Sequence, residues 1–199
     1  MMLIEETSVP DAALPVAAFK AHLRIGTGFA DEAIQDVVLA SFLRAAMAAI
    51  EARTGKILLS RVFSWALTNW HDAAAQGLPI APVTSITQVN LIDAMGAETL
   101  IDPSLYRLER DHHRPRLVAQ GRSLPVIPHH GEALISFTAG FAEDFEALPS
   151  DLAQAVFLLA GHYYDHRSET GMTGGAIPYG ASVLIERYKT MRLVAGGRS

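Results

Sequence analysis

The stretch IEARTGKILLSRVFSWAL, residues 50–67, contains the point at which the sequence pattern changes from helix to strand. Before it, residues 31–54 carry apolar side chains at helical spacing, and Gly55 stands where a glycine commonly follows a helix. After it, apolar side chains alternate with others, at Ile57, Leu59, Phe63, Trp65 and Leu67. Because successive strand residues point to opposite faces, this alternation is typical of a half-buried strand. The sequence therefore predicts a helix that leads directly into β structure.

Three further runs rich in β-branched and aromatic residues follow, at residues 83–92, 105–109 and 133–138. The prolines of this region stand between the runs, as expected of residues that close strands. They are Pro79, Pro82, Pro103, Pro115, Pro125 and Pro128. Residues 57–140 are accordingly predicted to form a small antiparallel β region.

Helical patterns flank this β region on both sides. Residues 16–25 and 31–54 predict two helices before it. The pattern after residue 148 predicts two more, one that begins near residue 150 and one over about residues 181–194. The predicted fold class is α+β: N- and C-terminal helices form one helical body, and a small central antiparallel β insertion interrupts it.

This pattern divides the chain into three parts. Residues 1–56 form the N-terminal helical part of the body, residues 57–140 the β insertion, and residues 141–199 the C-terminal helical part. The third part includes a glycine-rich stretch, GMTGGAIPYG, which predicts a flexible loop over residues 171–180. A basic tail follows that loop.

Two of the predicted helices are apolar on more than one face. In residues 31–54, Val38, Ala45 and Ala52 line one side and Leu39 and Leu43 the other. Such a helix needs cover on both sides, either from the β region or from further copies of the chain. The candidates for packing or subunit contact are Leu39, Leu43, Ile50, Phe157, Tyr163, Tyr164 and Arg167.

Length and composition narrow the classes of protein. The chain has 199 residues, of which 50% are hydrophobic, enough for the core of one domain. It has no cysteine, which excludes disulfides, cysteine-bound metals and a cysteine nucleophile. Neither a basic secretory leader nor an apolar run of membrane-spanning length is present in the sequence. We therefore expect a soluble cytoplasmic protein without membrane contact.

Charge is unevenly distributed along the chain. The net charge is −5, which argues against nucleic acid as the main ligand. Residues 181–199 carry +3, so the preceding 180 residues carry −8. One interpretation is that the basic tail docks onto an acidic surface of a neighbouring protein. The alternative is an ordinary solvated helix face.

A pair of histidines gives the sharpest chemical motif. His162 and His166 stand four residues apart, so they lie on one face of a helix, and Asp165 lies between them. A metal-dependent hydrolase is therefore the alternative function. However, Tyr163 stands where the HExxH motif has its glutamate, and no third ligand is evident. We expect no cofactor and no catalytic residues.

The order of several motifs resembles the head–tail connector, or adaptor, proteins of long-tailed phages and gene transfer agents. The resemblance covers about residues 18–167. Its motifs are FKAHLRI (residues 19–25), IEARTG (50–55), LPIAPV (78–83), Tyr106, FTAGF (137–141), ALPSDLAQAV (147–156) and HYYDHR (162–167).

The resemblance implies a structural virion protein and not an enzyme. It implies a closed ring of about twelve copies beneath the portal. The ring is expected to extend the DNA channel, to join the capsid to the stopper or another tail-side connector, and to let double-stranded DNA pass without sequence-specific binding. Assembly is expected in the host cytoplasm and the final location in the virion. A stopper or tail-completion protein is the alternative within the virion.

The resemblance also implies roles for individual residues. The turn that links the insertion back to the body consists of Thr138, Ala139, Gly140 and Phe141. The C-terminal part is expected to engage the portal, and residues 182–198 to become ordered only on docking. The portal-interface candidates are Leu184, Arg187, Tyr188, Lys189, Met191, Arg192 and Arg198.

Overall fold

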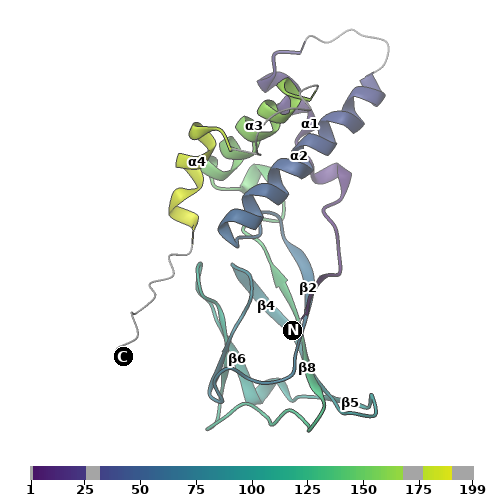
Figure 1. The fold of residues 1–199 in the computed structure, drawn as a ribbon, viewed down its shortest axis with the longest axis vertical. Helices are drawn as coiled ribbons and strands as arrows, with labels where there is room; N and C mark the ends of the chain where they lie inside the picture. Colours follow the sequence, from purple (N-terminus) through teal and green to yellow (C-terminus); the bar gives the residue numbers. More distant parts are fainter. Residues whose placement is uncertain (1, 26–31, 168–176, 190–199) are drawn as a thin grey trace.

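The computed structural model describes residues 2–25, 32–167 and 177–189, and it confirms the α+β class (Figure 1). A layer of helices lies at one end of the long axis, and antiparallel strands fill the other end. The helices are α1 (Val16–His22), α2 (Glu32–Thr54), α3 (Ser150–Asp165) and α4 (Tyr179–Ile185). The strands are β1 (Met2–Glu5), β2 (Arg61–Leu67), β3 (Ala75–Gly77), β4 (Val83–Ile92), β5 (Glu98–Leu100), β6 (Tyr106–Glu109), β7 (Arg116–Ala119) and β8 (Glu132–Ala139).

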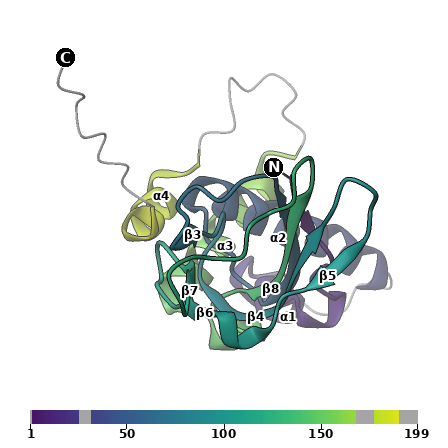
Figure 2. The same ribbon diagram turned by 90° about the horizontal axis from the view of Figure 1, so that it is seen from below.

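Two antiparallel sheets make up the strand end. The larger has the order β1-β2-β8-β4-β5 and the smaller the order β3-β7-β6. Viewed from below, they enclose a common interior, with β6 and β7 opposite β5 (Figure 2). Burial in β8 alternates strictly along the strand, as expected of a strand with one face on a core. Its Phe137 is in register with Phe63 of β2, and the two rings stack with centroids 5.9 Å apart.

Each end of the molecule has its own hydrophobic core. The helical core is built around Phe19, Leu43, Leu152, Leu159 and Ile185, which are all fully buried. The sheet core has Trp65, Leu117, Ile135 and Phe137 at its centre. Residues 57–59 connect the two, since Ile57 packs in the sheet core while Leu58 and Leu59 pack in the helical core.

The strands differ from the predicted pattern in three ways. β2 begins only at Arg61, so Ile57 and Leu59, which the alternation placed in the strand, precede it. β1 pairs with β2, so residues 2–5 belong to the large sheet and not to the helical layer. β3, β5 and β7 are each only three or four residues long and were not predicted. Segments this short carry too few positions for an alternating pattern to be recognised. β4, in contrast, has the predicted bounds.

The C-terminal helix also differs from its prediction. α4 begins at Tyr179 and is followed by a 3₁₀ turn at Glu186–Tyr188. Pro178 precedes the helix as its N-cap, where the fixed φ of proline suits a helix start. The predicted loop over residues 171–180 is therefore wrong in its last residues: Ile177 is buried, and Tyr179 and Gly180 are helical. Residues 171–176 and 190–199 lie outside the described residues.

Candidate interaction surfaces

The turn that returns the chain from the sheet to the helices lies at Gly140. Thr138 and Ala139 end β8, and the N–H groups of Gly140 and Phe141 donate to Pro82 O (3.0 Å) and Leu58 O (3.0 Å). Gly140 has a φ of +151°, and a Cβ at this position would lie 2.4 Å from the Cα of Ser60. The position therefore requires glycine, because the backbone of Ser60 approaches it so closely.

An ion-pair network joins the helical layer to the large sheet. Arg61 of β2 donates to both carboxylate oxygens of Glu51 on α2, at 2.7 and 2.6 Å, and to Glu5 of β1 at 2.9 Å. Glu51 also accepts a hydrogen bond from the Leu58 N–H at 2.9 Å. Burial raises the pKa of the Glu51 carboxyl, although Arg61 acts in the opposite direction. The network fixes the orientation of α2 on the sheet.

The two faces of α2 have different surroundings. Leu39, Leu43 and Ile50 are fully buried in the helical core and are therefore covered by their own chain. The opposite side, here called the outer face of α2, exposes Val37 to 73% and Val38 to 42%. Its remaining exposed residues are small: Ser41, Ala45, Ala48 and Ala52. Among the described residues, no other part of the chain covers Val37 and Val38 on the outer face of α2.

The second face of α3 is covered by the same chain. Phe157 stacks between Phe19 of α1, at 5.9 Å, and Phe145, at 5.2 Å. Tyr164 contacts Phe42 of α2 edge-on at 6.0 Å, and the Arg167 guanidinium lies 4.4 Å above the Tyr164 ring. Tyr163 is half-buried against the helical core. The helical layer itself therefore provides the cover that the aromatic side chains of α3 need.

The end of the described chain is attached to the start of α3. Tyr188 is buried, its hydroxyl donates to Asp151 Oδ1 at 2.8 Å, and Arg187 Nε lies 2.9 Å from Asp151 Oδ2. Lys189 pairs with Glu186, and Leu184 packs on the helical core. Residues 182–189 are thus ordered in the single chain, contrary to the expectation that they order only on docking. The other portal candidates, Met191, Arg192 and Arg198, lie outside the described residues.

The histidine pair lies at the end of α3. The His162 and His166 rings are 4.2 Å apart, and His166 Nδ1 lies 2.9 Å from the His162 carbonyl oxygen. Among the described residues there is no group of three or more histidine, aspartate or glutamate side chains able to hold a metal ion. Within residues 2–25, 32–167 and 177–189, no helix is long and apolar enough to cross a membrane.

A groove of about 750 Å³ lies between the end of α2, β3 and the segment before β7; we call it the β3 groove. Its apolar lining includes Leu78, Pro79, Ile80 and Ala81. Of the described residues that line it, four are basic and one is acidic: Arg53, Arg114, Arg116 and Lys189 against Asp72. The sequence pattern did not predict this surface, because its residues come from four separate segments of the chain.

The chain is similar over its full length to chains in solved structures of gene transfer agent (GTA) particles. One is from the neck of an empty GTA particle computed with C6 symmetry, with 53% identity, a TM-score of 0.90 and 100% of both chains covered. Another is from the virion of a native GTA particle, with 52% identity, a TM-score of 0.86 and coverage of 98% of this chain and 99% of that one. A third is from the neck of a native GTA particle computed with C12 symmetry, with 49% identity, a TM-score of 0.85 and 100% of both chains covered. No protein-family model and no curated protein matches the chain.

Sequence identities of 49–53% over nearly the whole chain establish membership of the same family and not only a shared fold. The similar chains are structural parts of a virion and not enzymes, so the alternative of a metal-dependent hydrolase is set aside. The protein belongs to the family of structural virion proteins found in the neck of gene transfer agent particles.

Proposed function

We propose that this protein is the head–tail adaptor of a gene transfer agent: a ring beneath the portal that extends the DNA channel and joins the capsid to the tail. The observation that carries the proposal is the full-length similarity, at 53% identity, to a chain in the neck of a GTA particle. Two such neck structures were computed with C6 and C12 symmetry, which supports a ring of about twelve copies.

The outer face of α2 supports self-association. Val37 and Val38 project into solvent from a helix whose other side is fully buried. The small residues Ser41, Ala45, Ala48 and Ala52 let a second helix approach closely, and the exposed valines favour burial against it. A second copy of the chain therefore fits this face, and in a closed ring every copy receives the same cover.

The charge distribution suits the two other proposed partners. Residues 1–180 carry −8, and an acidic conduit does not hold the phosphates of passing DNA. The basic residues after position 181 are proposed to contact the portal, with Arg187 and Lys189 at the described end of the chain. Both already form ion pairs, Arg187 with Asp151 and Lys189 with Glu186, so docking would have to exchange or extend these pairs.

Cryo-electron microscopy of particles tests the proposal. A wild-type strain and a deletion strain complemented with this chain should both show a ring directly beneath the portal, and the uncomplemented deletion should produce DNA-filled heads without tails. A ring separated from the portal by another protein would favour the stopper or tail-completion alternative. Tailed, infectious particles from the deletion strain would contradict both alternatives.

A further inference from the structure

The β4–β5 hairpin exposes apolar residues at its turn and on β5, and its charged residues are all acids. Between Val83 and Tyr106 the sequence has three carboxylates, Asp93, Glu98 and Asp102, and no lysine, arginine or histidine. Met95 at the turn is 92% exposed and Leu100 on β5 is 62% exposed. Exposed apolar residues beside acids, without any base, are typical of a surface that meets a basic and partly apolar partner.

β5 also has an open edge. It is the last strand of the large sheet, and the described residues place no strand on its outer side. Ile101 N–H donates to Val89 O at 2.9 Å and Asp93 N–H to Ala97 O at 3.0 Å, so residues 97, 99 and 101 bond to β4. Because bonding alternates along an antiparallel strand, the peptide groups of Glu98 and Leu100 point outward. An open edge of this kind is a template for another strand.

The β3 groove offers the complementary features. Ala119 N–H donates to Ala74 O and Leu78 N–H to Pro115 O, both at 2.9 Å, so residues 74, 76 and 78 bond to β7. The peptide groups of Ala75 and Gly77 therefore point away from β7, and both residues line the groove. The Gly77 carbonyl accepts a hydrogen bond from the Gln76 side chain at 2.9 Å.

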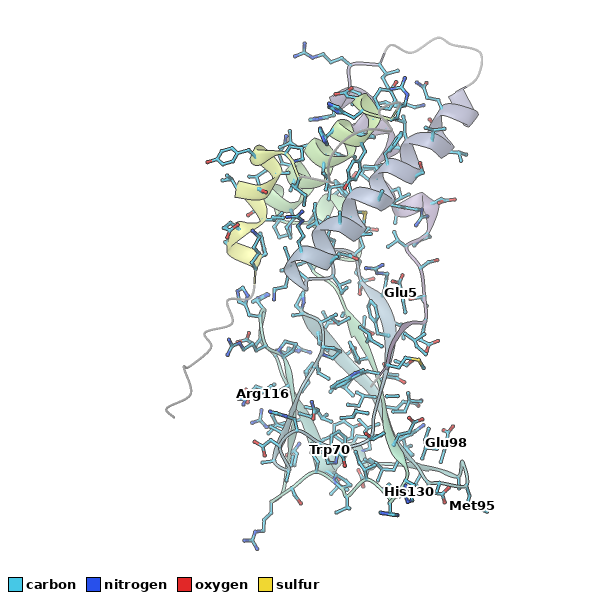
Figure 3. The ribbon with its side chains drawn as sticks, viewed as in Figure 1. Glu5, Trp70, Met95, Glu98, Arg116 and His130 are labelled. Atoms are coloured by element: carbon cyan, nitrogen blue, oxygen red, sulfur yellow. The ribbon has the colours of Figure 1, made fainter. Side chains whose placement is uncertain are left out.

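The charges and the positions of the two surfaces match. Four basic residues and one acid line the groove, although Arg116 and Lys189 already pair with Glu109 and Glu186, while residues 83–106 carry three acids and no base. Arg116 already bonds Glu109 through its Nε at 3.0 Å, and its side chain is half exposed. Met95 and Glu98 lie on the opposite flank of the molecule from Arg116 (Figure 3), and the view from below places β5 opposite β3 and β7 in the same way (Figure 2).

We infer that the β4–β5 hairpin of one copy docks into the β3 groove of the next, with the edge of β5 alongside the edge of β3. Two different surfaces on opposite flanks make a head-to-tail contact. Such contacts close into a ring when a whole number of copies completes one full turn. Hydrogen bonds between the two strand edges fix the orientation of the hairpin in the groove, and the apolar lining of the groove receives Met95 or Leu100. Arg116 lies higher along the long axis than Met95 (Figure 3), so the long axis must be inclined to the ring axis. This assignment rests on the proposed ring.

Cysteine cross-linking in purified particles tests it, since the natural chain has no cysteine. The test variant is Gly77→Cys with Leu100→Cys, because a Cβ at Gly77 meets no atom within 4 Å. Each copy then carries both halves of the contact, so a short bismaleimide should give a ladder of dimers, trimers and higher multimers on a denaturing gel. Each single variant should give no ladder. The matched control, Gly77→Cys with Val126→Cys, keeps an exposed apolar position but lies outside the hairpin.

Three results would overturn the inference. In particles that contain the chain, the test variant could stay monomeric, or it could form no more multimers than the Val126→Cys control. Gly77→Cys could instead be linked to a different particle protein, identified by mass spectrometry, which would make that protein the occupant of the groove. In all three cases the proposed adaptor function stands. Wild-type particles without this chain, in contrast, would contradict both the function and the inference.

Discussion

The Tyr188 hydroxyl donates a 2.8 Å hydrogen bond to Asp151 Oδ1 and so links the last described turn to the first turn of α3. Residues far apart in sequence thereby close the helical layer, and Tyr188 adds an edge contact of 5.5 Å with Phe141 of the return turn. The proposed portal-facing segment therefore begins from a fixed point.

Tyr188→Phe should lower the free energy of unfolding by about 1.5–3 kcal/mol, because it leaves the ring packing in place and removes the hydroxyl that donates to Asp151 and accepts from Arg187. Urea unfolding followed by circular dichroism measures this difference. Tyr179→Phe is the matched control, since Tyr179 lies on the same helical segment with 85% of its surface exposed. Equal losses in the two variants would show that the Asp151 bond does not stabilise the fold.

The same bond predicts a pH dependence. Burial raises the pKa of the Tyr188 hydroxyl above its ordinary value. A group with a raised pKa in the folded state contributes stability that is complete below its unfolded pKa and is lost as pH rises through the folded one. The stability difference between wild type and Tyr188→Phe should therefore be constant from pH 7 to 9 and shrink above about pH 10. A difference that grows in alkali would contradict this assignment.

Long patterns made the main elements predictable from sequence. The periodic apolar residues of α2 and the strand propensity of β4 give those elements nearly their observed bounds. β1 escaped prediction because all four of its residues are exposed, so no buried face imposes alternation. The start of α4 was not predicted because the glycines and Pro178 are typical of a loop. Burial of Ile177 and Ala181 in the helical core stabilises the helix start nevertheless.

The surfaces were less predictable than the fold. Helical periodicity identified two apolar sides on α2 and on α3, but it could not determine which side the chain itself covers. That depends on tertiary packing, such as Phe19 on Phe157 and Phe42 on Tyr164. The acidic hairpin did leave a sequence signal, a stretch of residues 83–106 without a base. Its complement, the β3 groove, exists only after four segments fold together.

Removal of Glu51 should be much more harmful than its neutralisation. Glu51→Ala leaves Arg61, whose side chain is 10% exposed, without its main partner, and loss of one member of a buried pair costs about 3–5 kcal/mol. Glu51→Gln keeps an oxygen that can accept from Arg61 and from Leu58 N–H, so its cost should be clearly smaller. Thermal and urea unfolding of both variants measure the difference. A loss in Glu51→Gln as large as in Glu51→Ala would show that the charge itself is required.

Gly140→Ala should destabilise the return turn. The new Cβ would lie 2.4 Å from Ser60 Cα, where backbone and not a flexible side chain must move, and the positive φ adds strain. We expect a loss of about 2–4 kcal/mol in unfolding free energy. Gly121→Ala, where a Cβ meets nothing within 4 Å, is the matched control and should change stability little. A neutral Gly140→Ala would mean that β8 can separate from Ser60 without cost.

A charge introduced on the outer face of α2 should impair ring assembly without affecting the stability of the single chain. Ala45 is exposed in the single chain, so Ala45→Glu should leave the unfolding free energy within about 0.5 kcal/mol of wild type. In a ring that buries this face, the same carboxylate would lose its water without a partner, and assembly should fall at least tenfold. Incorporation into particles, measured by immunoblot against the major capsid protein, gives the readout. Val126→Glu places the same charge on an exposed apolar position in a strand-end loop and is the control. Normal incorporation of Ala45→Glu would show that the face stays open in the neck, and the cover that α2 lacks would then have no part in the ring.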